Sequence, residues 1–370
     1  MVIGLHKRSI DYVLLICVLI LSLFGLLMVY SASNVVALYK YNDRFYFFKR
    51  QFIFFILGLI LMVILIRADI IKYKKYVSGI FFICLILLVL VLIPGIGIVR
   101  GGARSWIGFG SFSIQPSEFM KLAIVGLLAK YLSENYKDME IAKSFFLVLG
   151  LVGLIFLIIM LQPDLGTGLV IVLSCVILLF VTGAPIKYFV FIALIGLVGG
   201  SILIISAPYR IARITAFINP WQDPLGSGFQ GIQALFAITP GGLFGHGFNQ
   251  SMQKHFFLPE PQNDFIFAIL LEEFGLIGGA FTLLFFFIII YKGIEISLTV
   301  EDYFLKFLSL GISISLAVGV LINVGVVVGL LPVTGITLPL FSYGGSSLIL
   351  TMISLGILIS ISKYQNYDLR

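Results

Sequence analysis

One long polar stretch, about 55 residues between Pro208 and Gln262, interrupts an otherwise apolar chain. It ends in Leu258-Pro-Glu-Pro-Gln-Asn-Asp264, directly before a long apolar run. Long ordered loops usually serve a function. A carboxylate at the end of such a loop can contact a ligand. Placing a charge next to a hydrophobic segment costs free energy, so it usually has a function. Asp264 is therefore the first candidate for chemistry.

Acidic side chains also open two other apolar segments, in Gln115-Pro-Ser-Glu118 and Gln162-Pro-Asp164. Proline and an acid in the first turn are ordinary helix-start chemistry, so capping is an alternative role for each of them. Taken with Asp264, however, they predict several positive helix ends that face one compartment. Such an arrangement suits an anionic ligand such as a phosphate.

Lys121 is an amine one turn inside an apolar segment, where an unpaired charge costs about 2.5–3.5 kcal/mol. Glu118, three residues earlier, can pair with it on the same helix. Asp164 can pair with it from another helix. The pair can tie helices together or contact a ligand, and the sequence leaves both roles open.

Glu272 and Glu273 lie two turns into the apolar run that follows Asp264, roughly 12–14 Å along a helix. Adjacent helical residues point about 100° apart, so at most one of them faces a given cavity. We expect polar contacts between helices for both.

Three arginines are the best candidates for binding a phosphate, because arginine contacts phosphate and carboxylate groups bidentately. Arg100 and Arg104 lie in Arg100-Gly-Gly-Ala-Arg104-Ser-Trp106, and Arg213 lies at the start of the long loop. The alternative for all three is lipid headgroup binding, for the first two beside an interfacial Trp106. The cysteines and histidines show no disulfide or metal-ligand spacing.

The composition is that of a membrane protein. The chain has 370 residues, of which 60% are hydrophobic and only 11% charged, and its mean hydropathy is +1.15. Soluble domains carry about 25% charged residues. The net charge of +7 therefore indicates no nucleic-acid partner, and has to be interpreted through its distribution across the membrane.

A membrane-spanning helix needs about 20 apolar residues. Ten candidate segments lie at roughly 12–31, 48–66, 77–95, 116–133, 145–161, 165–182, 188–206, 264–291, 305–329 and 343–362. We predict an all-α polytopic membrane protein, a single domain over residues 1–370 with about ten transmembrane helices. A large extracellular loop, about 208–262, lies between the seventh and eighth. The first apolar run is too long for a cleaved signal peptide, so we expect it to stay as a span.

Lysine and arginine set the orientation. Loops on the side of the N-terminus carry more of them than loops on the opposite side. The positive-inside rule then predicts that both termini are cytoplasmic and that the long loop is outside. The outer side is nevertheless unusually basic, which fits an anionic ligand there.

Several motifs distributed over nearly the whole chain resemble the SEDS family (shape, elongation, division and sporulation), and most closely its FtsW/SpoVE branch. The matching stretches are Gly101-Gly-Ala-Arg-Ser-Trp106, Gln115-Pro-Ser-Glu-Phe-Met-Lys121, Gln162-Pro-Asp-Leu-Gly166, Arg213-Ile-Thr-Ala-Phe217, Pro220-Trp-Gln-Asp-Pro224, Phe257-Leu-Pro-Glu-Pro-Gln-Asn-Asp-Phe-Ile-Phe-Ala268 and Pro339-Leu-Phe-Ser-Tyr-Gly-Gly-Ser-Ser347.

The resemblance implies a ten-span protein of the bacterial cytoplasmic membrane that polymerises lipid II into peptidoglycan strands. It also implies a partner, a class B penicillin-binding protein that crosslinks the strands, together with other division, elongation or sporulation proteins. The essential loop aspartate of the family maps onto Asp264. Its fourth-span acid and amine map onto Glu118 and Lys121, and its hairpin acid maps onto Asp164.

Glycan polymerisation needs a sugar hydroxyl to be deprotonated as it attacks an anomeric carbon, and one carboxylate base suffices for an inverting displacement. We predict that Asp264 is this base. The lipid diphosphate would be neutralised by Arg100, Arg104 and Arg213, with help from a divalent cation such as Mg or Mn. A lipid II flippase and a non-catalytic scaffold of the division or sporulation machinery are the alternative functions.

Overall fold

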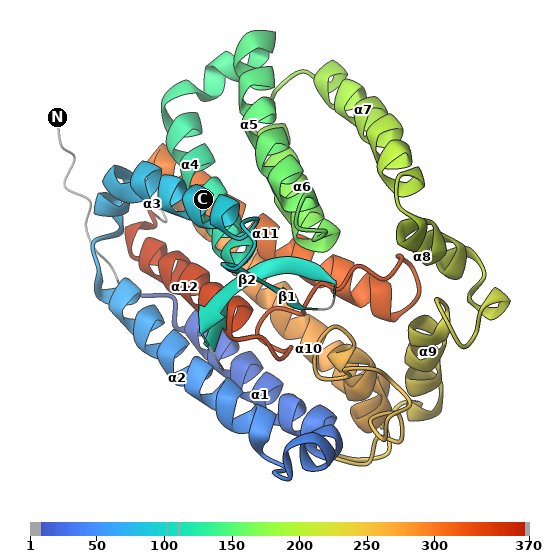
Figure 1. Cartoon of the computed structure of the whole chain (residues 1–370). Coiled ribbons are helices and arrows are strands. Elements are labelled where there is room, and N and C mark those ends of the chain that lie inside the picture. The colour runs from blue at the N-terminus through green and yellow to red at the C-terminus, as the bar shows by residue number, and fades with distance from the viewer. Residues whose placement is uncertain (1–8, 101, 110–111, 367–370) are drawn as a thin grey trace.

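The computed structural model describes residues 9–100, 102–109 and 112–366, and these form a bundle of helices (Figure 1). Each of the ten predicted segments corresponds to one long helix. In chain order these are α1 (Tyr12–Tyr41), α2 (Tyr46–Arg67), α3 (Tyr73–Leu90), α4 (Pro116–Asn135), α5 (Ala142–Met160), α6 (Leu165–Val181), α7 (Ile186–Ile205), α10 (Ile266–Thr299), α11 (Tyr303–Val327) and α12 (Gly345–Ile361). The helical polytopic fold is therefore confirmed.

Seven helices in the described part of the chain are long and apolar enough to cross a membrane, and these are α1, α2, α3 with its preceding short turn, α5, α10, α11 and α12. The segments represented by α4, α6 and α7 fall short of that standard. In α4 the reason is visible in the sequence, since it carries Glu118, Lys121, Lys130 and Glu134. Two of these four charged residues, Glu118 and Lys121, are the ones proposed above for a ligand.

The centre of the bundle is formed by α11 and α12. In their most apolar stretches, 78% and 72% of the residues are buried within the protein. By contrast, α2 and α3 are 28% and 22% buried, because their outward faces are left for lipid. α11 packs on α10, α4 and α6, and α12 packs on α2. α7 stands apart from α6 and makes its main contacts with α8 (Figure 1).

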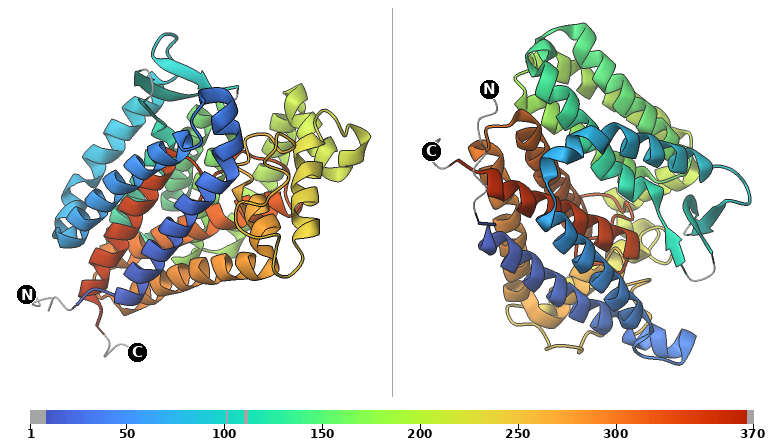
Figure 2. Two further views of the ribbon diagram at one scale, coloured as in Figure 1. Left: turned by 90° about the horizontal axis from the view of Figure 1, so that it is seen from below. Right: turned by 90° about the vertical axis from the view of Figure 1, so that its left-hand side faces the viewer.

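A three-stranded antiparallel sheet lies between α3 and α4, and the sequence analysis did not predict it. Its strands are β1 (Gly97–Arg100), β2 (Ala103–Phe109) and β3 (Phe112–Ile114), in the order β1-β2-β3. Figure 2 shows this sheet at one end of the bundle, and the start of α1 and the end of α12 at the other. At that second end the backbone N–H of Asp11 donates to the Ser362 hydroxyl, at 2.9 Å.

The long loop contains helices. α8 (Pro208–Ile218) is followed by a short 3-10 turn, η3 (Pro220–Gln222), and by α9 (Phe229–Gly241). Pro208 occupies the first turn of α8, where its missing N–H costs nothing. No residue of α8 is buried, and the helix is amphipathic, as expected of a helix that lies along a membrane surface. The remaining stretch, residues 242–265, is irregular and leads into α10.

α10 is broken at Gly275, which has φ 64° and ψ −164°. Lipid offers no hydrogen bonds, so backbone groups freed by a break need partners within the protein. The glycine-rich stretch at 242–247 supplies them through four hydrogen bonds, His246 N–H to Glu272 O (3.0 Å), Gly247 N–H to Glu273 O (2.8 Å), Leu276 N–H to Gly242 O (2.9 Å) and Ile277 N–H to Leu243 O (3.1 Å). A side chain at Gly275 would lie 2.5 Å from the Gly245 nitrogen, which explains the glycine.

Candidate active site

Asp264 lies in the turn directly before α10 and is partly buried. Its backbone carbonyl accepts a hydrogen bond from the Asn323 side chain on α11, at 2.8 Å. Asn323 also donates to the Ile336 carbonyl, at 2.7 Å. Gly335 lies beside the carboxylate, because a Cβ built there would be 3.6 Å from Asp264 Oδ2. The foot of the long loop is thus held against the segment between α11 and α12.

The surroundings of Asp264 favour its neutral form. Burial raises the pKa of its carboxyl from the ordinary 3.8 to about 6, and the negative charges of Glu260 and Asp164 act in the same direction. Arg213 opposes them by lowering the pKa. A carboxylate whose pKa approaches the working pH is better suited to take up a proton than an ordinary surface aspartate.

Asp164 is the N-cap of α6, where it accepts the backbone N–H of Thr167 at 3.2 Å. Its other oxygen accepts hydrogen bonds from Gln115 Nε2, at 2.9 Å, and from the Ser117 hydroxyl, at 3.3 Å. The carboxylate therefore joins the start of α6 to the start of α4. These donors occupy Asp164, and the structure pairs Lys121 with a different acid.

That acid is Glu118. Its Oε2 lies 2.7 Å from Lys121 Nζ, and the pair is largely shielded from solvent. Both residues line a cavity of about 60 Å³ between α4, α11 and α12, together with polar side chains such as Thr337, Ser347 and Thr351. The pair thus borders a space that a polar group can enter.

Arg213, on α8, is the predicted arginine that the structure places near Asp264. Its Nη1 donates to the Val333 carbonyl at 3.1 Å, and its guanidinium carbon lies 5.9 Å from the centre of the Tyr209 ring. Arg213 also lines a mainly apolar cavity of about 490 Å³. The walls of this cavity include Tyr209, Phe217, Leu225, Phe229, Pro259 and Leu331.

Arg100 and Arg104 lie on the β1–β2 hairpin, on different elements from those that carry Asp264, Asp164 and Arg213. The Arg100 guanidinium sits over the Trp106 ring, 5.3 Å from its centre. Stacking of this kind leaves the edge of the guanidinium free to contact an anion. The two arginines therefore lie at the end of the bundle that carries the sheet, on a different element from the carboxylate.

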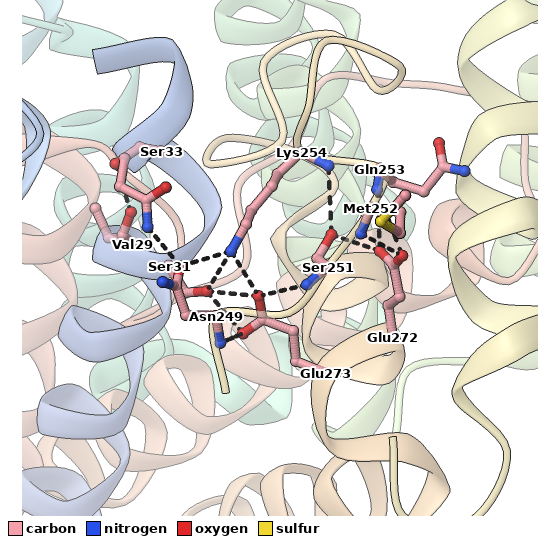
Figure 3. Close-up of polar contacts among 11 residues, drawn as sticks. Val29, Ser31, Ser33, Asn249, Ser251, Met252, Gln253, Lys254, Glu272 and Glu273 are labelled. Atoms are coloured by element: carbon pink, nitrogen blue, oxygen red, sulfur yellow. Dashed lines mark hydrogen bonds and ion pairs between the residues drawn. The ribbon is translucent and has the colours of Figure 1, made fainter. Parts of the chain in front are cut away.

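The predicted contact between helices is present for Glu273, whose carboxylate accepts the Ser31 hydroxyl of α1 at 2.6 Å. For Glu272 the prediction is wrong, because its hydrogen bonds come from Ser251 and Met252 of the long loop. Otherwise both carboxylates accept hydrogen bonds from the loop at residues 249–254 (Figure 3). The physical reason is the break at Gly275, which brings the loop backbone against this part of α10.

Sequence reasoning missed Asn323, Gln115 and Ser117 as supports of the two aspartates. An amide inside the apolar run of α11 was a usable signal, because polar side chains inside membrane helices are rare and usually have a role. Gln115 and Ser117 gave no comparable signal, since helix-start residues are commonly polar.

The cation prediction remains a prediction. Among the described residues, no three Asp, Glu, His or Cys side chains gather closely enough to form a metal site. A magnesium ion can also be held by one or two carboxylates together with substrate phosphates. Because the residues present do not by themselves form a cation site, we derive no step through a metal.

The comparisons with known proteins agree with this geometry. A model of the FtsW/RodA/SpoVE cell cycle proteins matches residues 11–367. The chain is 55% identical over 362 residues to stage V sporulation protein E of Bacillus subtilis, covering 98% of this chain and 99% of that protein. It is 40% identical over 353 residues to a probable peptidoglycan glycosyltransferase FtsW of Geobacter metallireducens, covering 95% and 94%.

Solved structures show the same fold. A chain of a peptidoglycan synthase complex that coordinates polymerization and crosslinking superposes with a TM-score of 0.77 at 29% identity, covering 97% of this chain and 99% of that one. The rod shape determining protein RodA of Thermus thermophilus gives a TM-score of 0.68 at 27% identity, with the same coverage. The chain therefore belongs to the FtsW/RodA/SpoVE family of cell cycle proteins, the SEDS family, and is an integral protein of the bacterial membrane.

Proposed function

We propose that this protein is a peptidoglycan glycosyltransferase that polymerises lipid II at the outer face of the cytoplasmic membrane, in division or sporulation. The observation that carries the proposal is the position of Asp264, a partly buried carboxyl with a raised pKa at the foot of the long loop. The names of the FtsW relatives and the fold of the synthase-complex chain support the same activity.

In the proposed reaction, Asp264 accepts the proton of the acceptor sugar hydroxyl as its oxygen attacks the anomeric carbon of the donor. A new glycosidic C–O bond forms, and the bond between the anomeric carbon and the diphosphate oxygen breaks. The configuration inverts, so no second carboxylate nucleophile is required. The proton ends on Asp264, and the lipid diphosphate leaves with both bonding electrons.

The leaving diphosphate needs positive charge near it, because charge develops on its oxygens as the bond breaks. Arg213 is the best-placed group for this role, since it acts electrostatically on Asp264 and lines the larger cavity. That cavity is mainly apolar, which suits a lipid-linked substrate. Arg100 and Arg104 would bind substrate phosphates from the hairpin. The small cavity beside Glu118 and Lys121 would take a polar group of the substrate next to this ion pair.

The proposed orientation places both termini in the cytoplasm and the loop and sheet outside. The sheet and the described chain ends lie at opposite ends of the bundle, which supports it (Figure 2). We also propose a class B penicillin-binding protein as partner, because the matched chain belongs to a complex that couples polymerization to crosslinking.

Purified full-length protein in lipid nanodiscs, incubated with lipid II, tests the activity. Glycan strands that grow with time, and that are digested by a muramidase, would support the proposal. Reconstitution into liposomes separates the alternatives. Movement of labelled lipid II between leaflets without strand formation would indicate a flippase. Absence of both activities, with or without a penicillin-binding partner, would leave a scaffold role.

A further inference from the structure

Six residues form a polar cluster where the long loop meets α1 and α10; all but Asn249 are buried, and the proposed reaction does not use the cluster. They are Lys254, Asn249 and Ser251 of the loop, Ser31 of α1, and Glu272 and Glu273 of α10 (Figure 3). The charged members are almost completely buried, with Lys254 2%, Glu272 1% and Glu273 0% exposed. Burying three charges is expensive, so the arrangement calls for an explanation.

The cation of the cluster is held from three directions. Lys254 Nζ lies 3.2 Å from Glu273 Oε1 and donates to Asn249 Oδ1 at 2.6 Å. The Ser31 hydroxyl lies 3.4 Å from the same nitrogen and donates to Glu273. The ammonium therefore joins the loop to both α1 and α10.

The two carboxylates bind the loop backbone. Glu273 accepts the N–H groups of Asn249 and Ser251, at 3.0 and 3.3 Å. Glu272 accepts the N–H of Met252 at 2.7 Å and the Ser251 hydroxyl. Carboxylates that accept backbone N–H groups are held at a defined position, and the N–H groups offset their charge. Two adjacent side chains of α10 thus fix a short run of loop backbone.

This run is the beginning of the segment that ends at Asp264. From it the chain continues through Leu258, which is 1% exposed and whose N–H donates to Gln253 O at 2.9 Å. It then passes Gln262, whose carbonyl accepts the Tyr343 N–H at 2.8 Å, before it reaches Asp264. The segment Asn249–Asp264 is therefore a loop tied at its start to α10, the helix into which its end leads.

We infer that Lys254, Glu272 and Glu273 are positioning residues, which hold the segment Asn249–Asp264 closed on α10 and so keep the Asp264 carboxyl in its shielded, catalytically competent place. The inference rests on the proposed glycosyltransferase activity. A purely apolar cluster of the same volume would bury area as well or better. It would not bind the loop N–H groups at defined positions, and this is what the charged cluster provides.

Positioning predicts a result that loss of stability alone does not give. If the segment opens, Asp264 becomes hydrated, and the burial that raises its pKa is lost. Glu260, Asp164 and Arg213 are the charged groups that act on Asp264, and Glu260 moves with the segment. The fall of kcat at acidic pH would then occur at lower pH, while kcat at its plateau decreases.

The test uses the full-length protein in nanodiscs with lipid II. Lys254→Met alone leaves two buried carboxylates without their cation, and it can prevent folding. The main variant is therefore Lys254→Met with Glu273→Gln, which removes a positive and a negative charge together. Lys254→Arg keeps the cation, and Ser31→Ala removes one neutral contact. Lys74→Met is the control, because Lys74 pairs with Glu134 in an exposed ion pair at 3.0 Å.

We expect kcat of the double variant to fall by about tenfold or more, as for a reacting group displaced by a fraction of an ångström, with KM within about twofold. The fall of its kcat at acidic pH, the acid limb of its pH–rate profile, should occur about one pH unit lower than in the wild type. Lys254→Arg and Ser31→Ala should show smaller changes in the same direction, and Lys74→Met should match the wild type. A double variant with unchanged kcat, or with reduced kcat and an unmoved acid limb, overturns the inference.

Hydrogen exchange separates this inference from the proposed function. Amides of residues 255–264 should exchange faster in the double variant than in the wild type, whether or not the protein polymerises lipid II. If the wild type polymerises and these amides exchange equally in both proteins, the positioning role is wrong and the activity stands. If the wild type is inactive but exchange is faster in the variant, the closed segment stands and the proposed activity fails.

Discussion

Lys121 Nζ lies 2.7 Å from Glu118 Oε2, and the two residues are three positions apart on α4. The pair borders the 60 Å³ cavity and does not include Asp164, which instead joins the starts of α4 and α6. The two acids that open α4 and α6 therefore have different partners. Each can be tested without disturbing the other.

Lys121→Met should destabilise the protein, because Glu118 would keep a buried charge without a partner. Breaking such a pair costs about 3–5 kcal/mol. Thermal unfolding in detergent measures the loss, with Lys74→Met as the matched control for an exposed pair. Lys121→Met with Glu118→Gln should recover most of the stability. Normal unfolding of the single variant would show that the pair contributes little.

The pH dependence of polymerisation should reflect Asp264. The rate should fall as the pH decreases through about 6, because the base becomes protonated. A steady-state rate profile between pH 5 and 8 measures it, with intact protein checked at each pH. A profile that stays flat down to pH 5 would show that the carboxyl is not shielded during turnover.

Ionisation of Asp264 should destabilise the folded protein, whereas ionisation of an ion-paired acid stabilises it. Its pKa is higher in the folded state, about 6 against 3.8, so the folded protein binds the proton more tightly. The ionised carboxylate therefore destabilises the fold above pH 6, and this penalty disappears as the pH falls from 6 to about 4. Asp264→Asn should raise the melting temperature at pH 7.5 and leave it unchanged below pH 4. A lower melting temperature at pH 7.5 would contradict the shift.

Arg213→Ala should impair turnover more than binding if the guanidinium stabilises the leaving diphosphate. Loss of one such group costs about 10²–10³ in kcat in other enzymes. Arg213→Lys keeps the charge but loses the fork geometry, and it should recover only part of the rate. The kcat and KM of each variant with lipid II measure the effect. A rise in KM with unchanged kcat would assign Arg213 to ground-state binding.

A class B penicillin-binding protein should form a stable complex with this chain and raise its activity. The fold of the synthase-complex chain supports the partner, and contact with the long loop can favour its active conformation. Co-purification with candidate partners, followed by strand synthesis with and without each, tests this. Full activity of the isolated protein that no partner changes would argue against activation.

The membrane helices were predictable from the sequence because apolar length determines them, as in α11 and α12. The pair of Lys121 with Glu118 was also one of the two predicted alternatives, since helical spacing brings residues three apart together. A link from Asp164 to α4 was among the predicted alternatives, but through Lys121. Its actual partners Gln115 and Ser117 were not predictable, because they become its neighbours only through the packing of α4 on α6.

The cluster around Lys254 illustrates a further limit. Periodicity places Glu272 and Glu273 on a helix, but it does not predict the break at Gly275 or the loop that pairs with it. The sheet at Arg100 and Arg104 escaped prediction for a similar reason. Its strands are short, and the sequence lacks the sustained apolar alternation that indicates a strand.

The central claim is that Asp264 is the general base, and Asp264→Asn tests it most directly. The amide has nearly the same shape but cannot take up the proton. Wild type and variant, purified alike and shown by melting temperature to be folded, are incubated with lipid II in nanodiscs. We predict a loss of strand synthesis of at least about 100-fold, the lower end for removal of a general base. Strand synthesis by the variant at a rate near that of the wild type would contradict the claim.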